Sequence, residues 1–173
     1  MKQSKPKKKH LYLAGSITVW KNQFKDKYSQ LFKKKISLFE PGKMNIPHDH
    51  RQIKESVAKT DSREIQKSDA VLAYMKDYKT TKHGGPVGTD SSWECGFAHG
   101  LGKPVIALID DVNQIEYYKH QWMVTFHIKA FISFDKKILN KLSSDSHFKN
   151  SDILYIENPI LLEESLYSYL HKI

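Results

Sequence analysis

Apolar residues along the chain follow two patterns that alternate with each other. Short continuous apolar runs, such as residues 10–14 and 105–109, are typical of strands in a parallel sheet that is covered on both faces. Between these runs, apolar residues recur every three or four positions, as in residues 18–34 and 53–67, which is typical of amphipathic helices. We therefore predict an α/β fold with a five-stranded parallel sheet flanked by helices, a three-layer sandwich of the Rossmann or flavodoxin-like type.

The same patterns place each element along the chain. The expected strands are residues 10–14, 36–39, 70–75, 105–109 and 130–134. The expected helices are residues 18–34, 53–67, a helix that opens near residue 91, 135–142 and 160–170. Residues 110–120 are a loop or a short helix, and the polar residues 143–152 are expected to be mobile. The last helix is expected to point four leucines inward, namely Leu161, Leu162, Leu166 and Leu170.

Composition limits the kind of protein that this pattern can form. A chain of 173 residues with 39% hydrophobic residues is long and apolar enough for one folded domain, which we place at residues 10–173. No apolar run approaches the ~20 residues that span a bilayer, so no membrane association is expected. The single cysteine, Cys95, cannot form an intrachain disulfide and suits a reducing compartment, which predicts a cytoplasmic protein.

The formal net charge of +9 raises the question of nucleic-acid binding. Much of this charge lies in residues 1–9, which we interpret as a basic flexible tail because like-charged runs are usually solvated. The five lysines of this tail are Lys2, Lys5, Lys7, Lys8 and Lys9. The remaining lysines form no stripe and no nucleic-acid motif, so no specific nucleic-acid partner is expected. A basic surface still favours an anionic substrate modestly.

The candidate chemistry centres on Glu94, which follows a loop rich in Gly and Pro and stands where the next helix opens. Residues 91–94 read Ser-Ser-Trp-Glu, which is also the pattern of a capping box, in which the carboxylate only satisfies backbone donors. The two interpretations are compatible. A carboxylate near a helix start gains about 0.3–1 kcal/mol from the helix dipole and stays ionised. An ionised carboxylate at the carboxyl edge of a sheet suits covalent glycosyl transfer.

Three segments of the sequence follow a pattern that resembles a known family. The first is Tyr-Leu-Ala-Gly-Ser-Ile at residues 12–17, and the second places Asp61 eight residues before Asp69. The third joins Glu-Cys-Gly-Phe-Ala at 94–98 to Gly-Lys-Pro-Val at 102–105. In this order and spacing, the segments resemble the nucleoside 2-deoxyribosyltransferase superfamily, which includes the deoxynucleoside 5′-monophosphate N-glycosidases. The resemblance covers roughly residues 10–134.

The resemblance implies catalytic roles for three residues. Glu94 would be the nucleophile that attacks the anomeric carbon of the deoxyribose and holds the sugar covalently. Tyr12 would direct its hydroxyl at that carboxylate, although a core aromatic on a strand is the alternative. Asp61 would protonate the departing base, a task typically worth ~10²–10⁴ in rate, although a charge on the helix surface or a helix cap is the alternative.

The resemblance also implies substrate contacts. The turn at 15–17 matches a place where sugar or phosphate oxygens meet backbone donors. Met123 matches a methionine of a late loop, which places Gln121 where the family uses a polar residue of a neighbouring subunit to contact the 5′ group. We therefore expect a homo-oligomer with shared active sites. The implied binding residues are Gly15, Ser16, Ile17, Gly88, Thr89, Gln121 and Met123.

Two departures from the family pattern matter. Gly88-Thr89 lies two residues further upstream than usual, and Asp90 stands in between, either as a base-side aspartate or as a helix cap; we favour a catalytic-site role. Thr18 stands where the monophosphate glycosidases tend to carry an arginine, and the loss of that bidentate phosphate donor favours nucleosides. Lys21 and the lysines of 76–82 could compensate for it.

Other chemistries fit less well. The spacing of His48, Asp49, His50 and His83 matches no zinc pattern, and the glycines of 84–88 lack the lysine of a P-loop, so no metal or cofactor is expected. We predict base exchange on 2′-deoxynucleosides, with free base as the second substrate. The alternatives are a 5′-monophosphate hydrolase and a nucleotide-binding module without turnover.

Overall fold

Six parallel strands form the middle layer of the computed structural model, which describes residues 7–15, 24–41, 50–75 and 89–173. The side chains of residues 50–54, 89–90 and 122–123 are not described. The strands are β1 (Lys9–Ala14), β2 (Ile36–Phe39), β3 (Ala70–Ala73), β4 (Val105–Ile109), β5 (Ile128–Ser133) and β6 (Asp152–Tyr155). The predicted α/β class and parallel sheet are confirmed, with one strand more than expected.

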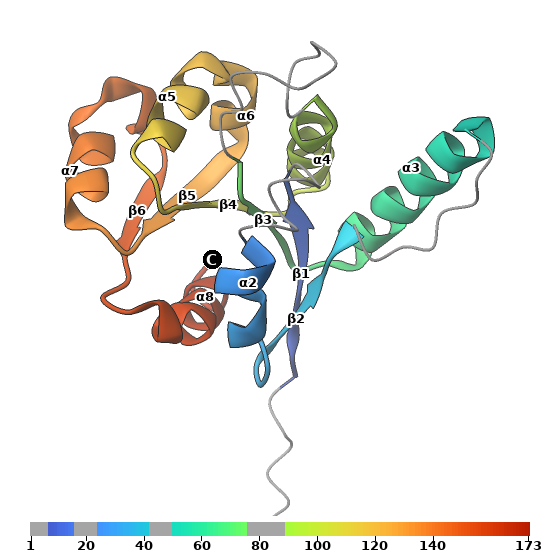
Figure 1. Ribbon diagram of the computed structural model, residues 1–173, viewed down its shortest axis with the longest axis horizontal. Helices are drawn as coiled ribbons and strands as arrows, with labels where there is room; N and C mark the ends of the chain where they lie inside the picture. The colour runs from blue at the N-terminus through green and yellow to red at the C-terminus, as the bar shows by residue number, and fades with distance from the viewer. Residues whose placement is uncertain (1–6, 16–23, 42–49, 76–88) are drawn as a thin grey trace, which may run out of the picture.

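Helices lie on both faces of this sheet (Figure 1). One face is covered by α3 (His50–Lys67), α4 (Thr89–Gly100), α5 (Asn113–His120), α6 (Trp122–His127) and α7 (Lys136–Ser144). The opposite face is covered by the short α2 (Lys25–Lys27), the 3₁₀ helix η2 (Ser29–Leu31) and α8 (Leu162–Leu170). Two further 3₁₀ turns are η4 (Ser146–Phe148) and η5 (Pro159–Leu161). Among the described helices, none combines the length and the apolar character needed to cross a membrane.

The side chains of each strand alternate between two separate cores. On β1, Tyr12 and Ala14 join the core under α4, whereas Leu11 and Leu13 join the core under α8. The central strands are apolar on both faces because helices cover both, which is why their sequences read as continuous apolar runs. The strand order is β2-β1-β3-β4-β5-β6, so the order reverses between β1 and β3. Ligands of open α/β sheets bind outside the carboxyl ends of the strands at such a reversal.

The sixth strand corrects the expectation that residues 143–152 are a mobile polar stretch. Phe148 of η4 is fully buried, and its ring meets that of Phe131 at 5.0 Å between centroids. The chain then pairs β6 with β5. The strand lies at the edge of the sheet and its residues are exposed or half-buried, so it lacks the apolar run that marks the inner strands.

The helix predicted at 18–34 is also corrected. Residues 16–23 lie outside the described residues, and the rest form α2 and η2, with Phe32 already extended. The turn at 33–35 is not helical, because its N–H groups bond to the carboxylate of Glu163. In the last helix, Leu162, Leu166 and Leu170 are buried as expected, but Leu161 is exposed because it belongs to η5.

Candidate active site

Tyr12 lies on β1, one of the two strands between which the strand order reverses. It is fully buried on β1, with its side chain on the face that α4 covers. Its ring stacks on Phe39 of the neighbouring β2, with 5.6 Å between ring centroids and 21° between ring planes. The register of the two strands, which sets Tyr12 opposite Phe39, produces this contact. The phenol is therefore held in one direction.

That direction leads to Glu94. The Tyr12 hydroxyl donates a hydrogen bond of 2.5 Å to Oε1 of Glu94, across 82 residues of sequence. Glu94 is 7% exposed and lies on the inner face of α4 together with Ser91, Cys95 and Ala98, at the spacing of one helix face. A carboxylate on this face would be costly without polar partners.

The start of α4 removes the capping-box interpretation. The helix begins at Thr89, so Ser91 lies inside it and Glu94 lies in its second turn. The Glu94 carboxylate accepts a hydrogen bond from a side chain of the sheet, that of Tyr12. The far end of α4 is closed by Gly102, whose φ of 70° allows Lys103 N–H to reach the carbonyl of Ala98.

Asp61 comes from α3 and joins the same buried region. It is 6% exposed and lies one helical turn before Ile65, whose side chain packs into the core beside Tyr12. The pKa of Tyr12 is raised well above the usual range, first by burial, then by Glu94 and then by Asp61. The phenol is therefore a donor and not a base at any physiological pH. The structure brings Tyr12, Asp61 and Glu94 together.

The turn after β1 leaves room only for glycine at position 15. A Cβ on Gly15 would lie 2.5 Å from the carbonyl oxygen of Tyr74, which is a backbone atom and cannot turn aside. The Tyr74 N–H in turn donates to the carbonyl of Ala14. Gly15 thus lets the main chains leaving β1 and β3 run against each other at the carboxyl edge of the sheet.

Cys95, the neighbour of Glu94, is a packing residue. It is fully buried, and burial first, then the charge of Glu94, raises the pKa of its thiol far above the usual range. A thiol in this state is not a nucleophile.

The remaining predicted residues are described less fully. Ser16, Ile17 and Gly88 lie outside the described residues, and only the helical main chain is described for Thr89, Asp90 and Met123. Gln121 stands between α5 and α6, where its main chain bonds to Tyr117, Val124 and Thr125. None of these described contacts of Gln121 reaches the Tyr12–Glu94 pair.

Two residues at the end of β2 were missed by the sequence reasoning. Phe39 packs on Tyr12, and Glu40, which follows it, is 8% exposed. A signal for both existed in the sequence: Gly15 and Gly42 closely follow the predicted strands 10–14 and 36–39, so the residues at the ends of these strands are expected at the same edge of a parallel sheet.

The described residues contain no cluster of three or more His, Cys, Asp or Glu able to hold a metal ion. Of the histidine-rich alternative, His48, Asp49 and His83 lie outside the described residues, and the side chain of His50 is not described.

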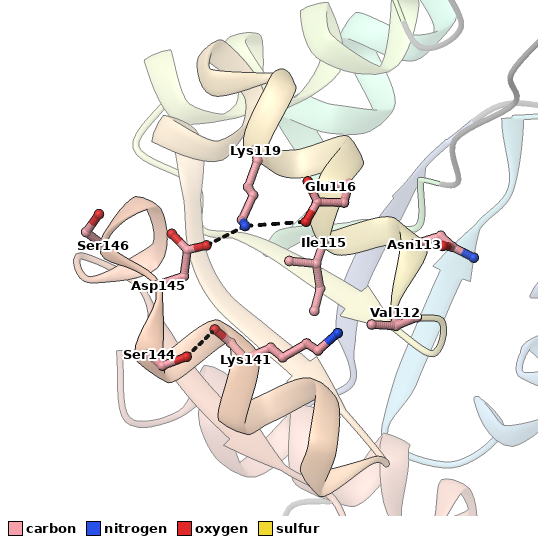
Figure 2. A pocket seen from close by; sticks show the side chains of 9 residues that line it. All are labelled: Val112, Asn113, Ile115, Glu116, Lys119, Lys141, Ser144, Asp145 and Ser146. Carbon is pink, nitrogen blue, oxygen red and sulfur yellow. Dashed lines mark hydrogen bonds and ion pairs between the residues drawn. The ribbon is translucent and has the colours of Figure 1, made fainter.

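A surface hollow of about 540 Å³ lies apart from this site, between α5 and α7 (Figure 2). Charged groups that satisfy one another line it: the Lys119 ammonium lies 2.7 Å from Asp145 and 3.3 Å from Glu116. Its lining shares no residue with the Tyr12, Asp61 and Glu94 group. We therefore take the buried group, and not the hollow, as the candidate active site.

A family model described as nucleoside 2-deoxyribosyltransferase matches residues 11–150. Among solved structures, the chain is similar to a 2-deoxyribosyltransferase from Bacillus psychrosaccharolyticus, with 18% identity and a TM-score of 0.47 over 85% of this chain and 99% of that chain. No curated protein matches the sequence.

Proposed function

The chain belongs to the nucleoside 2-deoxyribosyltransferase family, and we propose that it exchanges the bases of 2′-deoxynucleosides through a covalent deoxyribosyl-glutamate intermediate. The observation that carries the proposal is the 2.5 Å hydrogen bond from Tyr12 to Glu94, in a buried region that Asp61 shares. A nucleophile, a donor that orients it and a second carboxyl group are the parts that such a reaction needs.

In the first step, an oxygen of the Glu94 carboxylate forms a bond to C1′ of the deoxyribose. The C1′–N bond breaks, its electron pair goes to the base nitrogen, and Asp61 in its acid form supplies a proton to the base. Tyr12 keeps the carboxylate aimed at C1′. Its phenol stays protonated, because burial and the two carboxylates raise its pKa, so it does not compete for the proton.

In the second step, a nitrogen of another base attacks C1′ from the opposite side. The bond between C1′ and Glu94 breaks and its electron pair returns to the carboxylate, while the proton of the incoming base returns to Asp61. The reaction is balanced without a cofactor or a metal. Such base exchange suits nucleoside salvage, and buried Cys95 suits the reducing cytoplasm in which we place it.

Gly15 and its neighbours Ser16 and Ile17 would bind the sugar or its 5′ oxygen through backbone groups, with Gly88 and Thr89 nearby and Asp90 on the base side. Gln121 and Met123 would complete the site of a neighbouring subunit in a homo-oligomer. Figure 1 supports the oligomer in one respect: α3 extends away from the rest of the molecule, which leaves much of its length for another subunit to cover.

A second candidate, hydrolysis of 2′-deoxynucleoside 5′-monophosphates, shares the first step and uses water in the second. The excess of 28 basic over 19 acidic residues favours it, because a basic surface attracts a phosphate.

Product analysis separates the candidates. The protein is incubated with deoxynucleosides and with their 5′-monophosphates, each with and without a free acceptor base. We expect a new deoxynucleoside only when the acceptor is present. Release of free base from the monophosphates alone would refute base exchange and support the hydrolase. The lack of any reaction with all substrates would refute both candidates.

The nucleophile is tested with Glu94→Ala and with intact-protein mass spectrometry. We expect the wild-type protein, mixed with a deoxynucleoside and no acceptor, to gain the mass of one deoxyribosyl group. Glu94→Ala should neither gain this mass nor turn over substrate. Glu116→Ala, which removes an exposed carboxylate of α5, is the control and should behave like the wild type.

A further inference from the structure

Among the described residues, three side chains donate hydrogen bonds to Asp110, the residue that follows β4. Its carboxylate accepts from the hydroxyl of Tyr28 at 2.8 Å, from the hydroxyl of Tyr74 at 3.0 Å and from Nζ of Lys27 at 3.1 Å. Its side chain is 8% exposed. A carboxylate is costly to bury, and three donors around it provide the compensation.

The main chain around Asp110 is held as firmly as its side chain. Gln114, buried in α5, accepts with one amide oxygen from the N–H groups of Asp110 and Asp111, at 2.8 and 2.9 Å. Its amide nitrogen donates to the carbonyl of Met75 at 2.8 Å. The ends of β3 and β4 are therefore tied to each other and to the start of α5.

Tyr74 links this arrangement to the candidate active site. Its hydroxyl bonds to Asp110, its N–H bonds to the carbonyl of Ala14, and its own carbonyl is the atom against which Gly15 packs. Ala14 and Gly15 follow Tyr12 on the same strand. A shift of Tyr74 would therefore move the turn that follows β1.

Tyr28 contacts Asp110 from the segment that contains α2, on the face of the sheet opposite α4. Its ring packs on Tyr74 and on Phe134, with centroid distances of 6.0 and 5.6 Å. Burial, and then the bond to Asp110, raises the pKa of Tyr28 far above the usual range, so it remains a donor. One carboxylate thus joins the segment with α2, the end of β3 and the end of β4 at the edge where α/β sheets bind ligands.

We propose that Asp110 is a positioning residue for substrate binding, which acts through Tyr74 to fix the Gly15 turn against which the sugar binds. The inference rests on the proposed function, because it assumes that the Gly15 turn contacts a deoxynucleoside. Asp110 itself contacts no reacting atom. Its loss should weaken substrate binding more than it slows the chemical step.

The test compares Asp110→Asn with a matched control, Asp152→Asn. The amide keeps the shape of Asp110 but removes its negative charge, and its NH₂ group replaces one of the two carboxylate oxygens that accept from Tyr74. The control removes the charge from another Tyr–Asp bond, that of 2.6 Å from Tyr169 to Asp152, in β6 at the sheet edge. We expect Asp110→Asn to raise KM for a deoxynucleoside about tenfold with kcat within about threefold, and Asp152→Asn to leave KM unchanged.

Binding is also measured without turnover, by calorimetry in a Glu94→Gln background, where Asp110→Asn should raise Kd for the deoxynucleoside about tenfold. An active wild type with unchanged KM and Kd in Asp110→Asn would overturn the positioning role and leave the function standing. If the wild type binds deoxynucleosides without turnover and Asp110→Asn weakens this binding, the proposed function is refuted and the positioning role of Asp110 stands.

If Asp110→Asn does not fold, Tyr74→Phe removes a single donor from the same carboxylate and keeps the ring. We expect this variant to raise KM and Kd in the same direction. Wild-type values for Tyr74→Phe would overturn the proposal.

Discussion

Three effects raise the pKa of the Tyr12 phenol and keep it a hydrogen-bond donor. Burial, the Glu94 carboxylate and the Asp61 carboxylate all disfavour a negative phenolate, and burial is the largest of them. The phenol therefore cannot serve as a base, and in the proposed mechanism it holds Oε1 of Glu94, to which it donates a hydrogen bond. Under the proposed function, general acid and base chemistry then falls to a carboxyl group, and the tyrosine orients the nucleophile.

Tyr12→Phe should lower activity without unfolding the protein. The ring and its stacking on Phe39 remain, while one hydrogen bond to a charged group is lost. Such a bond contributes about 1.5–3 kcal/mol, so we expect kcat/KM to fall about 10- to 150-fold. Steady-state kinetics with a deoxynucleoside and an acceptor base measures the effect.

Tyr118→Phe is the control for this change. Tyr118 is also fully buried and belongs to the same core, but it lies on α5. Its kcat/KM should stay within about twofold of the wild type, because no bond to Glu94 is lost. An equal loss in both variants would mean that the hydroxyl of Tyr12 has no special part in the reaction.

At the scale of elements, one carboxylate shapes the turn that leads into β2. Oε1 of Glu163, at the start of α8, accepts from the N–H groups of residues 33, 34, 35 and 36 at 2.9–3.0 Å. Burial raises the pKa of Glu163, but these four bonds together outweigh it, and the pKa is lowered. The carboxylate thus does for this turn what a cap does for a helix end.

Glu163→Gln should destabilise the protein by about 1–3 kcal/mol at neutral pH, the cost of replacing bonds to a charged group. Since the folded pKa lies below the ordinary value of 4.5, this stabilisation is present above that pH and is lost as the pH falls through the folded pKa. Urea unfolding across this range measures the difference between wild type and variant, which should shrink in acid.

The adjacent Glu164→Gln provides the comparison. Glu164 is 56% exposed and forms an ion pair with Lys35 only at the surface. Surface pairs contribute about 0–1 kcal/mol, so this variant should unfold close to the wild type. Similar destabilisation by both changes would contradict a special role for the four main-chain bonds.

The same elements show which parts of the fold can be predicted from the sequence. β1, β3 and β4 are buried on both faces, so their apolar runs identify them directly. β6 is half-buried at an edge, and residues 32–35 take their shape from Glu163, far away in sequence, so neither has a local signal. Tyr12, Asp61 and Glu94 were found through a family resemblance. Phe39 could have been expected from its place at the end of a predicted strand, whereas the role proposed for Asp110 depends on contacts between elements and has no local signal.

For the molecule as a whole, buried tyrosines limit the stability of the folded state at alkaline pH. The pKa values of Tyr12, Tyr28, Tyr74 and Tyr118 are all raised above the ordinary value of 10, with burial as the largest cause for each. The folded protein keeps these protons while the unfolded chain releases them. Their contribution is therefore complete below pH 10 and is lost as the pH rises further.

We expect the free energy of unfolding to fall steeply above pH 10. Each such tyrosine contributes a slope of about 1.4 kcal/mol per pH unit, so four of them give roughly 5 kcal/mol per unit. Urea unfolding at increasing pH, with tyrosinate absorbance as a second signal, measures this slope. Ionisation of all tyrosines before unfolding begins would contradict it.

The Glu163 carboxylate also determines when the turn before β2 can fold during synthesis of the chain. Glu163 follows Ile36 by 127 residues in the sequence. The turn before β2 therefore cannot form all its hydrogen bonds until the ribosome has synthesised the chain beyond β6. At typical synthesis rates of 5–20 residues per second, that interval is roughly 6–25 seconds. Until then β2 has no carboxylate to fix its start, so this edge of the sheet cannot be completed before the start of α8 has been synthesised.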